Sequence, residues 1–214
     1  MSTLMRVSEN CAICGKKIIY NTLGSTNSFG ATDLDSRPPE MMRSTMSWWL
    51  KECERCGYVS THLSYNRNIT RKWLKSEKYT SCDERDFESD LAKRFYKYYL
   101  INLENEDPKK AFYAALHTAW CCDDQKDTDN AIHCRECALV EIEKIIPTTR
   151  KSEDLIIIKA DLLRRTGQFE AVIEEYQGKS FSKDLSNKII AFQIERAKAK
   201  DTACYTVDDA IGDF

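Results

Sequence analysis

The chain has 214 residues, of which 42% are hydrophobic and 31% are charged, and its formal net charge at pH 7 is −2. This composition supports folded cores, and it excludes both a disordered chain and a protein that binds nucleic acid through a large positive net charge. No apolar run approaches the roughly 18 residues of a membrane-spanning helix, and residues 1–8 lack the hydrophobic segment of a signal peptide, so we expect a cytoplasmic protein without membrane contact.

Two Cys-x-x-Cys-Gly motifs dominate the first third of the chain. Cys11 and Cys14 form the first motif, and Cys53 and Cys56 form the second. In a cytoplasmic protein, such cysteines indicate metal binding or buried thiols, not disulfides. Two facing motifs of this kind give tetrahedral four-sulfur coordination, which suits Zn²⁺ and leaves no position for water or substrate. We therefore predict one structural zinc ion, the alternative being two pairs of ordinary buried cysteines.

The segment between the two motifs, residues 15–52, is longer than the roughly 15–20 residues of the common zinc-ribbon spacing. The ribbon must therefore carry a long insertion. Residues 18–20 and 44–50 are rich in β-branched and aromatic side chains and are predicted as short strands. Residues 21–30 and 36–39 contain the Gly, Asn, Ser and Pro that are typical of loops.

A charged stretch within the insertion is a candidate binding site. Asp33, Asp35 and Arg37 precede a Pro-Pro pair. Arg37 could hold a carboxylate or phosphate of a partner, with the aspartates orienting it. The alternative is that these side chains brace the insertion against the rest of the fold, as polar loop clusters often do.

An aromatic and basic region follows. Trp48 and Trp49 lie beside the second cysteine motif and could stack on bases of a single strand. The basic residues that follow are Arg67, Arg71, Lys72, Lys75 and Lys78, with Trp73 among them. The alternative is that the tryptophans cover the ribbon core and that the basic residues belong to a polar linker.

From about residue 83 onward, apolar residues recur at three- and four-residue steps, which predicts a series of about six helices. Asp107 and Pro108 are a typical start for the second helix, and Pro147 ends the third. Further helices are predicted near 152–165, 169–177 and 184–200. The short polar connections imply antiparallel neighbours.

A second group of cysteines lies in this helical part. Cys121 and Cys122 end one predicted helix, and Cys134 and Cys137 begin the next, so the turn at 123–130 could bring them together. Free cysteine is commonly a buried packing residue. A second metal or redox site is the alternative, in which His133 could also serve as a ligand.

Residues 160–176 resemble a tetratricopeptide helix-turn-helix, with Gly167 ending its first helix, although the helix starts are not spaced by the regular repeat of about 34 residues. The cysteine motifs, residues 33–41, Ala119 with Trp120, and this hairpin together resemble a bacterial family of unknown function. That family couples a zinc-ribbon-like module to tetratricopeptide-like helices, and it implies no activity.

The sequence thus predicts an α-rich α+β protein. Residues 1–80 are expected to form a small zinc-ribbon-like β module, and residues 81–214 an antiparallel, tetratricopeptide-like helical array. No catalytic constellation is visible. We expect a cytoplasmic zinc-binding interaction or scaffold protein that recognises a protein or peptide partner. The alternative is a nucleic-acid-associated regulator that uses the ribbon and the aromatic and basic stretch 48–78.

Overall fold

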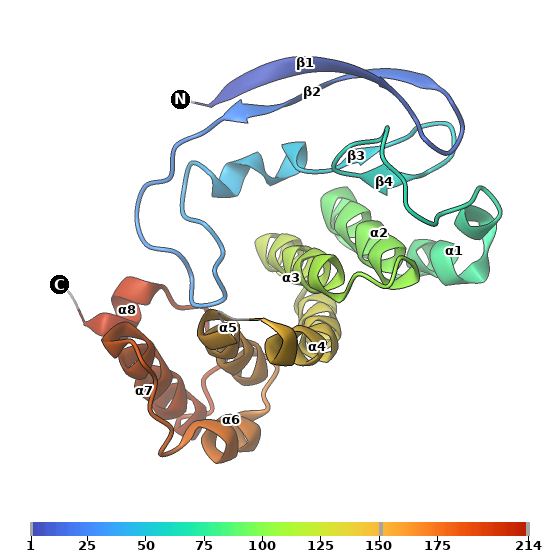
Figure 1. The fold of residues 1–214 in the computed structure, drawn as a ribbon. Coiled ribbons are helices and arrows are strands. Elements are labelled where there is room, and N and C mark those ends of the chain that lie inside the picture. Colours follow the sequence, from blue (N-terminus) through green and yellow to red (C-terminus); the bar gives the residue numbers. More distant parts are fainter. Residues whose placement is uncertain (1, 150–151, 213–214) are drawn as a thin grey trace.

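The computed structural model describes residues 2–149 and 152–212, in which two antiparallel β-hairpins precede a run of packed helices (Figure 1). The strands are β1 (Thr3–Asn10), β2 (Lys17–Ser25), β3 (Lys51–Glu52) and β4 (Val59–Ser60). β1 pairs with β2, and β3 pairs with β4. The turn of each hairpin contains one of the two cysteine motifs. The α-rich α+β class predicted from the sequence is confirmed.

The insertion between the cysteine motifs is only partly as predicted. The strand expected at 18–20 lies within β2, but most of the strand expected at 44–50 is instead the 3₁₀ helix η1 (Arg43–Trp48). Thr45 and the residue after it are both buried, whereas successive residues of a strand face opposite sides. The Trp49 indole Nε1 also donates a hydrogen bond to Thr45 Oγ1 at 3.0 Å. This local bond and the consecutive burial explain why the strand prediction was wrong.

The helical part is longer than the predicted series. Its α-helices are α1 (Glu77–Glu84), α2 (Asp90–Glu104), α3 (Pro108–Gln125), α4 (Thr128–Ile145), α5 (Ser152–Arg165), α6 (Phe169–Tyr176), α7 (Asp184–Lys198) and α8 (Val207–Ile211). The short 3₁₀ helix η2 (Trp73–Lys75) precedes α1, and a second one, η3 (Ile146–Thr148), lies between α4 and α5. The boundary expected at residue 80 falls within α1, and the division into two domains stays a prediction.

Side-chain caps set several of the helix starts. Asp107 accepts a hydrogen bond from the Lys110 amide and Pro108 occupies the first helical position of α3, as predicted. A cap at Ser89 was not predicted. Its hydroxyl accepts from two backbone amides at the start of α2, and it separates α2 from α1 where the sequence indicated one helix from about residue 83. Gly167 has φ +76°, a left-handed conformation that suits glycine, and it separates α5 from α6 as expected.

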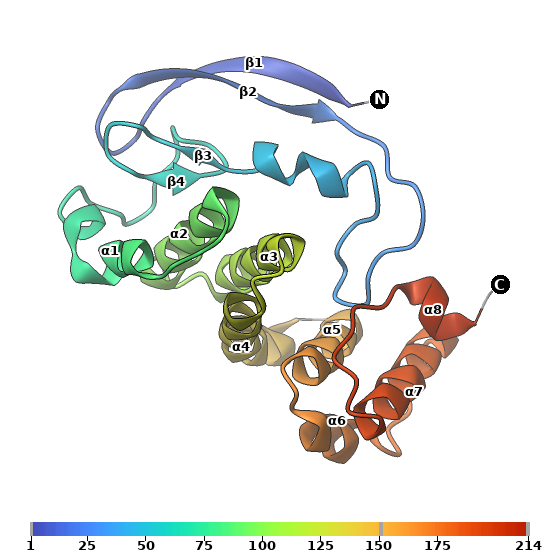
Figure 2. The ribbon, with the colours of Figure 1, turned by 180° about the vertical axis from the view of Figure 1, so that it is seen from behind.

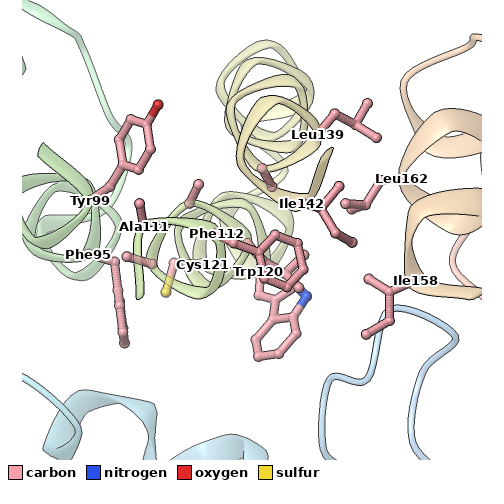
Figure 3. Packing of buried hydrophobic residues seen from close by; sticks show 14 of the residues in the cluster. Phe95, Tyr99, Ala111, Phe112, Trp120, Cys121, Leu139, Ile142, Ile158 and Leu162 are labelled. Carbon is pink, nitrogen blue, oxygen red and sulfur yellow. The ribbon is translucent and has the colours of Figure 1, made fainter. Parts of the chain in front are cut away.

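A single hydrophobic core connects the hairpins to the helices. It includes Cys11, Leu50 and Val59 of the hairpin region as well as Phe95 and Phe112 of the helices. Figure 3 shows how side chains from α2, α3, α4 and α5 fill the space between these helices. The small β region and the helices therefore share one set of buried contacts.

The insertion loop, residues 26–42, connects the hairpins to the far end of the helical array. Figures 1 and 2 both show it descending from β2 toward α5 and α8. The Leu34 amide donates to the Tyr205 carbonyl at 2.9 Å, and the Val207 amide donates to the Thr32 carbonyl at 2.9 Å. The loop is therefore held by backbone hydrogen bonds to the segment that leads into α8.

Candidate metal centre

Four cysteine thiols meet where the turns of the two hairpins face each other. The Sγ atoms of Cys11, Cys14, Cys53 and Cys56 all lie within 4.8 Å of one another. Cys11 Sγ lies 3.7 Å from Cys56 Sγ, and Cys14 Sγ lies 3.6 Å from Cys53 Sγ. A tetrahedron with Zn–S bonds of about 2.3 Å has S···S edges of about 3.8 Å, so this four-cysteine cluster fits one zinc ion.

The two motifs reach this geometry by the same local hydrogen bonding. Gly15 and Gly57 each have φ +73°, which lets the backbone turn back tightly after the second cysteine. The Gly15 amide donates to the Cys11 carbonyl and the Gly57 amide to the Cys53 carbonyl, both at 2.8 Å. Two matching turns thus present two thiols each toward a common centre.

Burial and mutual proximity shift the thiol pKa values in different directions. Burial raises the pKa of Cys11, and burial together with the neighbouring thiols raises the pKa of Cys56. At Cys14 the effect of burial is outweighed by hydrogen bonds with the Lys16 backbone and the other thiols, which lower its pKa to about 7. Four thiolates this close repel one another, and a divalent cation would stabilise all four in the deprotonated form.

Hydrogen bonds attach the cluster to the helices. The Tyr79 hydroxyl of α1 donates to the Gly57 carbonyl. Lys97 of α2 forms an ion pair of 2.7 Å with Glu52, next to the second cysteine motif. If a zinc ion binds here, the four thiols would occupy all of its tetrahedral positions, and such a closed centre would be structural.

Three charged residues of the insertion loop, Asp33, Asp35 and Arg37, are buried. Arg37, only 6% exposed, forms an ion pair of 2.6 Å with Asp124 at the end of α3. Asp33 is buried and pairs with Arg43 at 2.6 Å. These contacts correspond to the bracing alternative, because the side chains are engaged within the chain.

Asp35 is completely buried beside α3 and α5. It accepts a hydrogen bond from Trp120 Nε1 at 2.7 Å and one from Arg165 at 3.3 Å. Figure 3 shows the Trp120 indole between α3 and the insertion loop. Burial and the Asp161 carboxylate raise the pKa of Asp35, while the Arg165 and Arg135 guanidinium groups oppose that shift.

The second cysteine group does not form a comparable centre. Within residues 2–149 and 152–212, no group of three or more His, Cys, Asp or Glu side chains other than the four-cysteine cluster is placed to hold a metal ion. Cys121, Cys122 and Cys134 are buried, and Cys137 Sγ lies 3.5 Å from His133 Nε2. Their surroundings match the packing interpretation.

The two adjacent tryptophans have different environments. Trp49 packs edge-on against Phe95 and His117. Trp48 is partly exposed, and the Lys51 Nζ lies over its ring, 5.6 Å from the ring centroid. The basic residues of the 67–78 stretch are all exposed, namely Arg67, Arg71, Lys72, Lys75 and Lys78. Both tryptophans are half-buried, but of the two only Trp48 has a cation from the described residues over its ring, whereas Trp49 packs against the core.

No family model, curated protein or solved structure matches this chain. The resemblance to a bacterial family, drawn from the motifs, therefore stays a prediction. What the structure establishes is a four-cysteine cluster on a small N-terminal β region, followed by antiparallel helices. None of the helices in the described part of the chain is long and apolar enough to cross a membrane.

Sequence reasoning missed residues that hold the metal region in place. Glu9 accepts hydrogen bonds from the Leu63 amide and the Ser64 hydroxyl, both at 2.6 Å, and so joins β1 to the segment after β4. Neither Glu9 nor Tyr79 belongs to a recognisable motif. One missed feature did carry a signal: Thr206 and Asp209 form a capping box at α8, and their three-residue spacing is typical of that motif.

Proposed function

We propose that this chain is a zinc-stabilised interaction protein that recognises a protein or peptide partner through its helical array. The observation that supports this most directly is the closed four-cysteine cluster, which shares one core with the helices. Zinc in such a centre has no open position for a substrate. Its role would be to hold the two hairpins and the insertion loop in place on the helices.

The exposed helix faces are the proposed contact surface. Val140 of α4 and Leu185 of α7 are large apolar side chains that are 58% and 46% exposed. Stacked helix pairs commonly offer extended surfaces to peptides or helices. The insertion loop would support this surface indirectly, because Asp33, Asp35 and Arg37 are buried and pair within the chain.

Capture from native lysate, followed by cross-linking and mass spectrometry, tests this proposal. We expect a protein partner that survives nuclease treatment, with cross-links that map to α4 through α7. Val140→Asp and Leu185→Asp should each weaken capture, while the matched exposed substitution Leu4→Asp on β1 should leave it unchanged. Capture that depends entirely on intact nucleic acid would contradict the proposal.

A nucleic-acid-associated role is the second candidate. It is favoured by the exposed basic residues of the 67–78 stretch and by the cation–π contact of Lys51 with Trp48. Fluorescence anisotropy with a single-stranded oligonucleotide tests it. This role predicts binding that weakens steeply with salt and is reduced in both Trp48→Ala and Lys72→Ala. Binding that neither substitution affects would exclude this surface.

A further inference from the structure

A cavity of about 410 Å³ lies between the segment that joins η1 to β3 and the helices α2 and α3. Its walls are mainly aromatic, and they include Trp49, Phe95, Tyr98, Tyr113 and His117. We refer to it as the aromatic cavity. Its volume falls in the range of small-molecule sites, and such sites are typically apolar with a few placed polar groups.

His117 is a polar residue of the lining that is surrounded by aromatic rings. Its ring is surrounded by other rings, with centroid distances of 4.7 Å to Trp120, 5.1 Å to Trp49 and 5.4 Å to Phe95. No hydrogen bond reaches its ring nitrogens from any residue that the structure describes. His117 is half-buried and lines the aromatic cavity, so its unpaired ring nitrogens are available to hydrogen-bond a ligand atom there.

The protonation state of this imidazole follows from its surroundings. Burial lowers the pKa of His117 to about 3. At neutral pH the ring is therefore uncharged, with one nitrogen donating and the other accepting. It can thus pair with a polar ligand atom without requiring a charge there.

The mouth of the aromatic cavity carries excess positive charge. Lys110 forms an ion pair of 3.0 Å with Asp107, and both line the cavity. Lys109 also lines it, is exposed, and has no ion pair with any described residue. Aromatic walls alone would attract a cation. The additional lysine reverses that preference and favours an anionic group at the mouth.

We propose that the aromatic cavity binds a small aromatic carboxylic acid, with its ring among Trp49, Phe95 and Tyr113 and its carboxylate toward Lys109. His117 would hydrogen-bond a polar atom of the bound molecule. Because Trp49 belongs to the segment beside the second cysteine motif, the ligand would contact both the hairpin region and the helices. This site is independent of the partner surface proposed above on α4 through α7.

Isothermal titration calorimetry with matched probes tests the charge preference. The probes are 3-phenylpropionate and indole-3-propionate, each compared with its uncharged amide and its primary amine. If the carboxylate contacts Lys109 at the mouth, the acids should bind about tenfold more tightly than the amides. Added salt should reduce this difference. Failure of both acids to bind at millimolar concentration, or equal affinity for acid, amide and amine, would overturn the proposal.

Variants of the full chain locate the binding site. Lys109→Gln should reduce the affinity for the acids to that for the amides, whereas Lys126→Gln at the opposite end of α3 should change nothing. Thr61→Trp at the mouth should block all of the probes, and because Thr61 is exposed, circular dichroism can verify that this variant folds. Undiminished binding in folded Thr61→Trp, or equal losses in the two lysine variants, would contradict the assignment.

Discussion

The buried carboxylate of Asp35 illustrates how single residues hold the insertion loop in place. Its partners Trp120 and Arg165 come from α3 and α5, so one side chain connects the loop to two helices. Arg165 also forms an ion pair with Asp123 at 3.0 Å. Removing one member of such a set leaves a buried charge without full compensation, which costs more than the loss of a surface pair.

Asp35→Ala is therefore expected to lower the free energy of unfolding by about 3–5 kcal/mol. Urea denaturation followed by circular dichroism measures the change. Asp184→Ala is a suitable control, because the Asp184 side chain is 85% exposed and pairs with Lys188 on the surface of α7. That control should lose less than about 1 kcal/mol. Equal losses of unfolding free energy in the two variants would show that the buried pairing of Asp35 stabilises the fold no more than a surface ion pair.

His117 gives a prediction about pH. Its pKa is lowered in the folded state to about 3, below the ordinary value of 6.5. The unfolded chain therefore binds a proton at this site below about pH 6.5 while the folded chain does not. The contribution of His117 to stability is complete above that pH and is lost progressively as the pH falls toward 3.

As the pH falls from about 6 to about 4, the protonation of His117 in the unfolded chain should lower the free energy of unfolding by about 1.4 kcal/mol for each pH unit. The rings that surround it do not titrate in this range, so His117→Phe should remove this part of the slope. Comparing urea midpoints of the two proteins across the range isolates the effect from acid-sensitive groups elsewhere. If the urea midpoints of the original protein and of His117→Phe change in parallel with pH, His117 is freely protonated in the folded chain.

At the level of elements, the link between the insertion loop and α8 is the main unexpected contact. The short helix begins with a capping box in which Thr206 Oγ1 accepts from the Asp209 amide and the Asp209 carboxylate accepts from the Thr206 amide. Thr206 also forms an isolated antiparallel bridge with Asp33. The cap thus orients both the helix and the chain segment that pairs with the loop.

Thr206→Ala should reduce stability by about 1 kcal/mol through loss of the cap. It should also increase proteolytic cleavage in the insertion loop, since the loop's backbone partners lie beside this residue. Thr202→Ala, an exposed position four residues earlier, is the matched control and should change neither quantity. A loop equally resistant to protease in both variants would mean that α8 does not support it.

The sequence predicts elements well where the signal is local. Proline and an aspartate cap correctly mark the start of α3, and glycine correctly marks the turn after α5. The region 44–50 was mispredicted because its aromatic residues suit a strand, while hydrogen bonding within η1 decides its structure. Contacts such as Leu34 with Tyr205 join residues far apart in the chain, and no local pattern encodes them.

The candidate sites likewise include residues that a local sequence pattern identifies and residues whose role no local pattern reveals. The repeated spacing identified all four thiols of the four-cysteine cluster, because each turn is a local structure. The roles of Asp33, Asp35 and Arg37 were left open, since composition cannot distinguish a binding loop from a bracing one. Their partners become visible only in the structure: Asp124 for Arg37, Arg165 for Asp35 and Arg43 for Asp33.

At the scale of the whole molecule, the metal region and the helices should unfold together. Tyr79 connects α1 to the second cysteine turn, and the core extends from the hairpins into the helices. Removing zinc would therefore affect the helices as well as the ribbon. Such coupling would extend the stabilising effect of a bound zinc ion beyond its four ligands.

Stripping the metal with a chelator should lower the thermal midpoint of helix unfolding, measured by circular dichroism at the helical signal. Tyr79→Phe should partly uncouple the two regions, so that chelation affects this variant's helical midpoint less than that of the original protein. Tyr65→Phe is the matched control, because the Tyr65 ring is exposed. An unchanged helical midpoint after complete metal removal would show that the helices fold independently of the ribbon.

The most direct test of the account is the zinc content of the purified chain, measured by elemental analysis. We predict one zinc ion per chain, lost together with N-terminal order in Cys53→Ser. The combined replacement of Cys121, Cys122, Cys134 and Cys137 by alanine should leave the content at one. Full retention of zinc after all four residues of the four-cysteine cluster are replaced by serine would contradict the account, because the metal would then be bound elsewhere.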